Sequence, residues 1–456
     1  MSNMRERWPP QGLPRGRELL DYILAPSNSS SLARADAILP GAADEILINQ
    51  VIQDLIADGR GALGLSSGQI NLADMILPED NLILEGAGAA TAITTAVADL
   101  ELIRLWEKDN TKIRDILFDG GGVADIAIRL DGTAVTGVRC FHNTVKGCFF
   151  RDFDVAGIFS GDPLATGQGT LDLKIFDNYF YDCGYGYGSH EAYSSKVSLN
   201  HFEDCGSGIR MKGHESVMSL NTFKTNTYGI ESMDYGSSIM GNAFTGHTYA
   251  IYLFGGRRQN VIGNNFILGV TPICVTASGN TITGNVIDRC SGSAIIITGG
   301  DFNILQSNIV RTPDTNDSGD PGILIEAGAD FTQIKDNFVD DAFQDALELN
   351  DVENCQVKGN ELVNNGRYGI LLDNAALQNK IKNNETAGNT TACMRINNVN
   401  CVRNLITGNS FDEGNISDVG GAHNCVAYLN YDPSAGTFIV TINPPAVVGG
   451  GGGVLP

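Results

Sequence analysis

The sequence lacks any apolar run of about eighteen residues, so it predicts no membrane-spanning helix and no insertion into a membrane. Basic residues are scarce as well, because 30 Lys and Arg stand against 53 Asp and Glu, for a formal net charge of −23. Such an acidic chain argues against nucleic acid and anionic membrane surfaces as partners. The first eight residues hold no apolar signal segment. We therefore expect synthesis in the cytoplasm and, for any external destination, a route that needs no N-terminal signal peptide.

The ten cysteines include no Cys-x-x-Cys pair, which leaves a structural zinc site without support. Cys183 and Cys205 stand at matching places in the motifs Tyr-Asp-Cys-Gly and Glu-Asp-Cys-Gly. This match favours a buried stack in which cysteine acts as a small apolar residue. A disulfide between the two is the less favoured alternative.

What the sequence does contain is an asparagine that recurs every two dozen residues or so. The residues around it are similar each time, as in Ser219-Leu-Asn-Thr-Phe223 and Met240-Gly-Asn-Ala-Phe244. A fixed period in this range predicts a stacked solenoid, in which each repeat covers the apolar face of its neighbour. The recurring positions are Asn178, Asn200, Asn221, Asn242, Asn264, Asn285, Asn308, Asn337, Asn360, Asn384 and Asn409.

Each repeat is predicted to hold short strands and turns only. Residues 229–234 and 238–244 are alternating runs separated by a turn, which is typical of strands of about four to six residues. A helical crossover between parallel strands needs ~30 residues or more, so it does not fit. The chain is therefore expected to be all-β, with each strand lying parallel to its predecessor ~4.8 Å away. The asparagine is expected to turn a corner in left-handed backbone, with its amide hydrogen-bonded along the column.

Glycine-punctuated coils, inward aliphatic residues and an asparagine corner resemble the right-handed parallel β-helices of the pectin-lyase-like superfamily. The start is similar too, because residues 43–55 have the apolar spacing of an amphipathic helix that Gly59 would end. In this family such a helix covers the open end of the solenoid, and residues 80–88 resemble the first coil after it. The apolar residues of the predicted helix are Ile48, Val51, Ile52, Leu55 and Ile56.

The resemblance implies a single-stranded right-handed parallel β-helix with an N-terminal capping helix, over roughly residues 20–425. It does not imply one chemistry, because this superfamily hosts lyases, hydrolases, epimerases, transferases and non-enzymatic spikes. Many β-helix spikes are trimers, so the resemblance also implies a homotrimer and a virion, cell-surface or extracellular location. The predicted parts are 1–35, an attachment or oligomerisation segment; 36–80, the capping helix and entry strands; 81–425, the β-helix; and 426–456, a C-terminal strand and Gly-rich tail.

A filled solenoid has no internal cavity, so function is expected on outward side chains of the strands and on the loops beside them. The coils near residues 188–258 gather acids, bases and aromatic residues more densely than any other consecutive coils. Aligned on their Gly-Ile starts, they predict one outward column of Gly188, Arg210, Glu231 and Tyr252, and a second of His190, Lys212, Met233 and Phe254. At the strand ends come Glu191, His214, Glu215, Asp234 and Tyr235.

Two mechanisms are open for this surface. For hydrolysis, Glu191 and Asp234 are placed two coils apart with Cα atoms ~9.6 Å apart. Carboxyl groups ~6.5–9.5 Å apart favour inversion, with Glu231 able to serve as either partner. For elimination or epimerisation of a uronate, a cation would neutralise the substrate carboxylate while a base takes the C5 proton. The cations are Arg210 or Lys212, and the bases are His190, His214 or Lys212.

Substrate binding is assigned to Arg210, Glu215, Tyr235, Tyr252 and Phe254. The many acids favour a neutral or weakly charged glycan over a polyuronate unless calcium bridges the charges. The plain alternative for Arg210 and Glu231 is a surface ion pair, worth ~0.5 kcal/mol. A second outward set ranks below this surface and comprises Glu326, Glu348, Asn350, Asp373 and Arg395.

No cofactor is required by these assignments. Calcium is the one ion that the sequence suggests, because Asp314, Asn316 and Ser318 alternate before Gly319 as in a looped calcium motif. The acid expected at the twelfth place is missing, since Ile325 stands there. An ordinary polar turn is therefore the favoured prediction. The leading hypothesis is a glycan-binding and glycan-cleaving β-helix, either a hydrolase or a lyase, and the alternative is a non-catalytic structural or adhesive spike.

Overall fold

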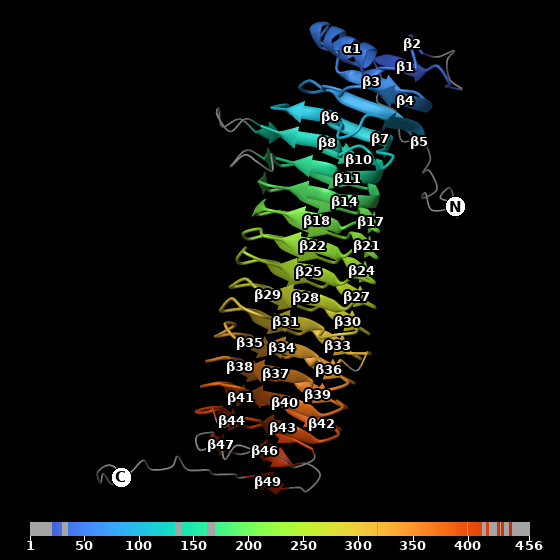
Figure 1. The fold of residues 1–456 in the computed structure, drawn as a ribbon. Coiled ribbons are helices and arrows are strands. Elements are labelled where there is room, and N and C mark those ends of the chain that lie inside the picture. The colour runs from blue at the N-terminus through green and yellow to red at the C-terminus, as the bar shows by residue number, and fades with distance from the viewer. Residues whose placement is uncertain are drawn as a thin grey trace.

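The described part of the chain forms one long parallel β-helix, with a single helix near its N-terminal end (Figure 1). The computed structural model describes residues 21–29, 35–132, 139–161, 169–316, 318–398, 400–412, 416–418, 426–428, 430–432 and 437–439. Within these residues each strand pairs in parallel with the equivalent strand of the next coil, and the one antiparallel pair lies near the C-terminal end. No helix in the described part is long and apolar enough to cross a membrane. The predicted all-β solenoid is confirmed.

Three ribbons of strands run along the solenoid, and each coil visits them in the order A, B, C. Ribbon A comprises β1 (Tyr22–Pro26), β3 (Ala62–Leu65), β10 (Thr144–Lys146), β13 (Lys174–Phe176), β16 (Lys196–Ser198), β20 (Val217–Ser219), β23 (Ser238–Met240), β26 (Asn260–Ile262), β29 (Thr281–Thr283), β32 (Ile304–Gln306), β35 (Gln333–Lys335), β38 (Gln356–Lys358), β41 (Lys380–Lys382), β44 (Leu405–Thr407) and β47 (Val426–Tyr428). Ribbon B comprises β4 (Gly68–Leu72), β17 (His201–Glu203), β21 (Thr222–Lys224), β24 (Ala243–Thr245), β27 (Asn265–Ile267), β30 (Val286–Asp288), β33 (Ile309–Arg311), β36 (Phe338–Asp340), β39 (Glu361–Val363), β42 (Glu385–Ala387), β45 (Ser410–Phe411) and β48 (Asn430–Asp432).

Ribbon C carries the outward surface on which function is expected. Its strands are β6 (Glu101–Trp106), β8 (Ile126–Asp131), β18 (Ser207–Met211), β22 (Tyr228–Ser232), β25 (Tyr249–Leu253), β28 (Thr271–Val275), β31 (Ile295–Ile297), β34 (Ile323–Ile325), β37 (Leu347–Asn350), β40 (Tyr368–Asp373), β43 (Ala392–Ile396) and β46 (Ile416–Asp418). Four long strands bend from one ribbon into the next, namely β5 (Ile83–Thr95), β7 (Lys112–Asp119), β11 (Phe149–Ser160) and β14 (Tyr179–Ser189).

A fourth, short ribbon flanks ribbon C and matters for the site. It comprises β9 (Cys140–Phe141), β12 (Thr170–Leu171), β15 (Ala192–Tyr193) and β19 (Gly213–His214). Two strands stand apart from the ribbons. β2 (Ala37–Leu39) pairs with β1 near the N-terminal end, and β49 (Thr437–Ile439) pairs antiparallel with β48.

The helix α1 (Glu45–Ala57) lies over the N-terminal end of the solenoid, as predicted (Figure 1). It buries Ile48, Val51, Ile52 and Leu55, while Ile56 remains 36% exposed at the edge of this face. Burying these side chains covers the apolar end of the first coils, which would otherwise face water. The chain leaves the helix through Gly59, whose φ of 71° suits a residue without a Cβ atom.

The recurring asparagines form a buried column between ribbons A and B. Each Oδ1 accepts a bond from the backbone N–H and another from the Nδ2 group of the preceding asparagine, at 2.9–3.1 Å from Asn178 to Asn430. Most of the Nδ2 groups also donate to a backbone carbonyl of the preceding coil, as Asn264 does to Ile239. The predicted backbone role was wrong, because the left-handed residue is the one before each asparagine, such as Leu220 or Gly241.

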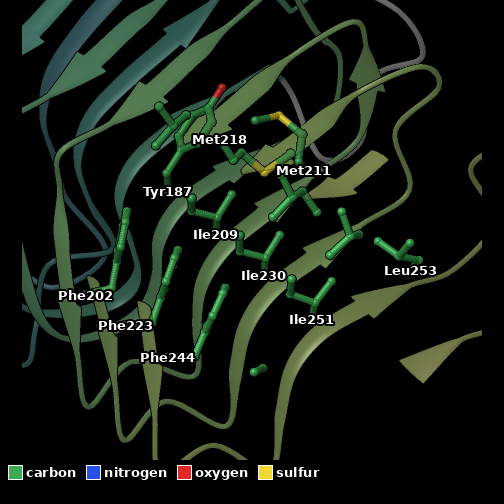
Figure 2. Close-up of a cluster of buried hydrophobic side chains, with 14 of the residues drawn as sticks. Tyr187, Phe202, Ile209, Met211, Met218, Phe223, Ile230, Phe244, Ile251 and Leu253 are labelled. Carbon is green, nitrogen blue, oxygen red and sulfur yellow. The ribbon is translucent and has the colours of Figure 1, made fainter. Parts of the chain in front are cut away.

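The core consists of columns of identical or similar side chains (Figure 2). Phe202, Phe223 and Phe244 stack with ring centroids 4.7–4.9 Å apart, and facing them Ile209, Ile230 and Ile251 form an aliphatic column. The full ring stack is Phe118, Phe150, Phe180, Phe202, Phe223, Phe244 and Phe266. Cys183 and Cys205 are free thiols in this core, as the matching motifs predicted.

The segment predicted for attachment or oligomerisation, residues 1–35, includes one strand of the solenoid. Residues 22–26, assigned to an attachment or oligomerisation segment, form β1, which pairs with β2 and β3 as part of the solenoid. Their burial against the first coil explains the difference, since Leu24 and Ala25 are wholly buried. Residues 1–20 and 440–456, to which the remaining N-terminal segment and the glycine-rich tail were assigned, lie outside the described residues.

Candidate functional site

The predicted outward column of ribbon C is present. Gly188 pairs with Arg210, Arg210 with Glu231, and Glu231 with Tyr252, so these four residues lie on one face of adjacent coils. Because side chains alternate along a strand, His190, Lys212 and Phe254 lie two residues further along the same face. The alignment of the coils on their Gly-Ile starts therefore predicted this register correctly.

Arg210 and Glu231 each bond to a neighbour on this face. The Arg210 guanidinium donates to Tyr185 Oη at 2.5 Å and lies over the Tyr185 ring, 5.3 Å from its centroid. The Glu231 carboxylate accepts a bond from the Ser207 hydroxyl. Both groups are thus held by neighbours on ribbon C, which leaves them less available to a ligand than the prediction assumed.

Four aromatic rings continue this surface towards the C-terminal end. Tyr228 and Tyr249 stack at 5.5 Å, and Tyr252 lies about equally near both, at 6.0 and 5.9 Å. Phe254 stacks on Tyr252 at 4.9 Å. The predicted binding residues Tyr252 and Phe254 therefore belong to one aromatic cluster on ribbon C.

A groove of about 240 Å³ lies between ribbon C and the short ribbon. Gly213, Gly255 and Gly256 line it, and a Cβ atom at Gly213 or Gly256 would collide with the backbone carbonyl of Ala192 or Asp234, so these two glycines allow adjacent coils to pack closely. Of the predicted site residues, Glu191, Lys212, His214 and Tyr235 line it. Two further lining residues are Met233, which belongs to the predicted second outward column, and Tyr193, which had no predicted role. The groove combines a carboxylate, an ammonium group, an imidazole and two phenols.

One wall of the groove is a file of rings that follows the short ribbon. Tyr193 stacks on His214 at 5.0 Å, and His214 lies 5.9 Å from Tyr235 at an angle of 45°. Both ends of this file are covered by guanidinium groups, Arg139 over Tyr193 at 4.0 Å and Arg258 over Tyr235 at 5.8 Å. The rings therefore present their edges and polar atoms to the groove, with positive charge close by.

Asp234 is not part of this surface, which corrects the hydrolytic pair. Its side chain is 0% exposed and points into the core, where the Ser237 hydroxyl donates to Oδ2. Gly188 pairs with Arg210 and Ala192 pairs with Gly213. The coil that contains Glu191 therefore has one residue more between these two positions than the next coil has. A shift of one residue moves a side chain to the opposite face of a strand. Because His214 pairs with Tyr235, Asp234 is in register with Gly213 and not with Glu191, and its side chain points inward.

Burial has a chemical consequence for Asp234. The carboxyl group is surrounded by serines and no cation pairs with it, so burial raises its pKa from 3.8 to about 7. The Oδ1 atom is buried and has no hydrogen-bond partner. Asp234 is therefore an internal acid behind the groove rather than a catalytic group within it.

The remaining predicted residues flank the groove. His190 lies beside Phe159, with ring centroids 6.1 Å apart. Glu215 follows His214 at an exposed corner with a φ of 56°. The second outward set is also assembled, since Glu348 lies between Leu324 and Leu371 and accepts a bond from Asn350 at 2.9 Å. Burial raises the pKa of Glu348, and Asp373 pairs with Asn350 in the next coil.

The loop considered for calcium has a different arrangement. The Asp314 carboxylate is buried and accepts bonds from the backbone N–H groups of Ser318, Gly319 and Asp320, at 2.9–3.1 Å. These N–H groups donate to the oxygens of Asp314 that a cation would need, so the carboxylate of Asp314 closes the turn of its own loop. Among the described residues no group of three or more His, Cys, Asp or Glu side chains is placed to hold a metal ion. In this arrangement the loop is a polar turn closed by Asp314, and calcium binding stays a prediction.

Comparison with known proteins places the fold. The family model described as "Right handed beta helix region" matches residues 101–267, 236–386 and 271–431. Among solved structures, the A-module of the mannuronan C-5 epimerase AlgE6 of Azotobacter vinelandii is similar, with a TM-score of 0.51 and 13% identity over 86% of this chain and 96% of that one. A tailspike double mutant of E. coli bacteriophage HK620 in complex with a pentasaccharide gives a TM-score of 0.59 and 13% identity, over 85% and 77%. No curated protein matches the chain by sequence.

Proposed function

Since the chain belongs to the right-handed β-helix family, of the pectin-lyase-like type, we propose that the groove between ribbon C and the short ribbon binds a glycan. The single observation that carries the proposal is the groove itself, which gathers Glu191, Lys212, His214 and Tyr235 in one depression. A depression lined by aromatic side chains and a few convergent polar groups is typical of a ligand site. The epimerase and tailspike neighbours, which act on mannuronan or hold a pentasaccharide, support a glycan as the ligand.

The groove favours proton abstraction over hydrolysis by paired carboxylates. With Asp234 inside the core and Glu231 bonded to Ser207, Glu191 is the one carboxylate among the groove-lining residues. Lys212 can neutralise a uronate carboxylate, and the nearby Arg139 and Arg258 add to the positive charge. This local charge favours a uronate in spite of the acidic chain as a whole.

The proposed reaction is an elimination at such a uronate. His214, as neutral imidazole, takes the C5 proton while the bond between C4 and the bridging oxygen breaks and a C4–C5 double bond forms. The phenol of Tyr193 or Tyr235 gives a proton to the departing oxygen, so the proton count balances. The alternative of a non-catalytic adhesive spike keeps the same groove for binding alone.

The proposal is tested by incubating the protein with alginate, pectin, xylan, dextran and a purified O-antigen polysaccharide. Elimination produces unsaturated uronate, which absorbs ultraviolet light, whereas hydrolysis produces reducing ends without it. Binding is followed in parallel by retardation in native gels that contain each polysaccharide. Retardation without any product supports the adhesive alternative, and no retardation by any polysaccharide refutes the glycan site.

Tyr235→Ala is expected to weaken binding of the retarding polysaccharide by about tenfold, since it removes a ring and a hydroxyl from the groove wall. Tyr181→Ala serves as control, because Tyr181 lies on the outward face of ribbon B, away from the groove. Affinity gels measure both variants. Equal loss in the two variants would contradict a specific role for the groove.

Lys212→Ala is expected to lower the rate of unsaturated-product formation by about a hundredfold, because the substrate carboxylate loses the cation that stabilises the developing charge. Lys196→Ala, on the outward face of ribbon A, is the matched control and should leave the rate unchanged. Initial rates at saturating polysaccharide separate this effect from weaker binding. A rate within a factor of about two of wild type would remove Lys212 from the mechanism.

A further inference from the structure

Beyond the groove, two phenylalanines on the same edge of the solenoid are exposed in an unfavourable backbone conformation. Phe302 and Phe331 are 60% and 43% exposed, and their φ angles are 61° and 56°. Left-handed backbone is the conformation of this corner in successive coils, and it is disfavoured for a bulky side chain. Their rings stack with centroids 5.0 Å apart. The pair therefore exposes a rigid aromatic surface at a conformational cost.

The pair lies on the corner that borders the groove. The left-handed corner residues after the groove wall are Glu215 and then Gly236, Arg258, Gly279, Phe302 and Phe331 in successive coils. Backbone bonds from Gly236 to Arg257, from Gly279 to Asp301 and from Phe302 to Asp330 fix this order. With ~4.8 Å between coils, Gly279 lies roughly 10 Å along the axis from the coil of Tyr235.

Gly279 leaves a gap between two side chains that suit a sugar. A Cβ atom at this position would have only Arg258 Cγ within reach, at 4.0 Å, so the space above the glycine is open. The residue that follows Gly279 at this corner is Phe302, whose ring stacks on that of Phe331 one coil further on. Arg258 precedes Gly279 at this corner and also lies over the Tyr235 ring. Arg258 thus lies between the gap and the Tyr235 ring of the groove wall.

We propose that this gap is a second sugar subsite, in which one ring of a glycan chain stacks on Phe302 while its hydroxyl or carboxylate oxygens accept bonds from Arg258. The inference rests on the proposed function, because it extends the ligand of the groove along the axis of the solenoid. Apolar faces of sugar rings pack on aromatic rings, and guanidinium donors suit oxygen acceptors. A chain long enough to reach from Lys212 past Gly279 then contacts both subsites, and a short one fills the groove alone.

Two variants test the gap from opposite directions. Gly279→Asn fills it with an amide and Phe302→Asn removes the ring, while asparagine tolerates the left-handed backbone at both positions. Gly284→Asn is the matched control, because Gly284 has a φ of 65° at another corner and open space around it. All three proteins are compared with wild type by calorimetry, using size-graded oligosaccharides from the polysaccharide that retards the wild type in the gel panel.

The wild type is expected to bind an octasaccharide about tenfold more tightly than a trisaccharide. Gly279→Asn and Phe302→Asn should lose this preference and keep the trisaccharide affinity, and Gly284→Asn should keep both. Equal octasaccharide affinity in all four proteins overturns the second subsite while leaving the groove intact. Sedimentation that shows Phe302→Asn dissociating an assembly, with unchanged glycan binding, overturns it in favour of a contact between copies of the chain. A wild type that no polysaccharide retards removes the proposed function and this inference together.

Discussion

Asp234→Asn is expected to stabilise the protein by about 4 kcal/mol at pH 8 and to have little effect near pH 4. The carboxyl group is 0% exposed and its Oδ1 atom has no partner, so the neutral form is favoured in the folded state. Burial raises its pKa from 3.8 to about 7. A difference of about three units at ~1.4 kcal/mol each gives the magnitude. Asparagine has a similar shape and no charge to bury.

The direction of the pH dependence follows from proton binding. Between about pH 4 and 7 the unfolded chain has lost the proton of Asp234 while the folded protein retains it. The unfolded state therefore binds fewer protons, so the free energy of unfolding falls as pH rises through this window and levels off above it. Urea unfolding at pH 5 and pH 8 measures the effect, with the exposed Asp351→Asn as control. Equal pH dependence in wild type and Asp234→Asn would refute it.

Asn264→Ala is expected to lower the free energy of unfolding by about 3–6 kcal/mol. Its Oδ1 atom accepts from the backbone N–H and the Nδ2 group of Asn242, and its own Nδ2 group donates to the Ile239 carbonyl and to Asn285. Removing the carboxamide takes one bond from each of four groups, namely the backbone N–H and the Nδ2 group of Asn242, the Ile239 carbonyl and the Asn285 Oδ1 atom. Each buried group left unpaired costs about 1–3 kcal/mol.

Asn265 provides a matched control for the column. It is the next residue, has the same side chain and is exposed on ribbon B. Asn265→Ala should therefore change the free energy of unfolding by less than about 0.5 kcal/mol. Thermal and urea unfolding of the two variants give the comparison. If Asn264→Ala were as mild as its neighbour, the hydrogen bonds of the column would contribute little net stability.

Much of the fold could be predicted because each coil buries similar side chains at similar positions. An inward Ile or Phe and a buried Asn recur at fixed spacing, so the columns that contain Ile230 and Asn242 were visible in the sequence alone. The backbone conformation of the asparagine could not be predicted in the same way, since the spacing of a repeat does not tell which residue of a corner has a positive φ. Strand β1 was missed because Tyr22–Pro26 precedes the first complete repeat and has no asparagine to mark its phase.

The sequence placed the candidate site on the coils where the groove lies, but it did not show which residues line the groove. Arg210, Glu231 and Tyr252 share a register that the Gly-Ile starts reveal, so their common face was foreseeable. The single extra residue at Glu191 was not recognised, and that shift alone turns Asp234 from an outward partner into a buried acid. Tyr193 was overlooked because the short ribbon adds only two residues per coil. The signal that would have found it is the Tyr193, His214 and Tyr235 series at one position in consecutive coils.

Because successive coils have the same corners and the same hydrogen-bonded columns, a repeat of this protein can be gained or lost in evolution. Between the Tyr235 coil and Gly279 every coil continues the same hydrogen-bonded columns, so duplication or loss of one whole repeat there would leave both junctions matched. It would also move Phe302 by one strand separation relative to Lys212. Unequal recombination between repeats would therefore change, one coil at a time, the distance between the proposed groove and the proposed second subsite. The coils that carry these two sites would stay unchanged.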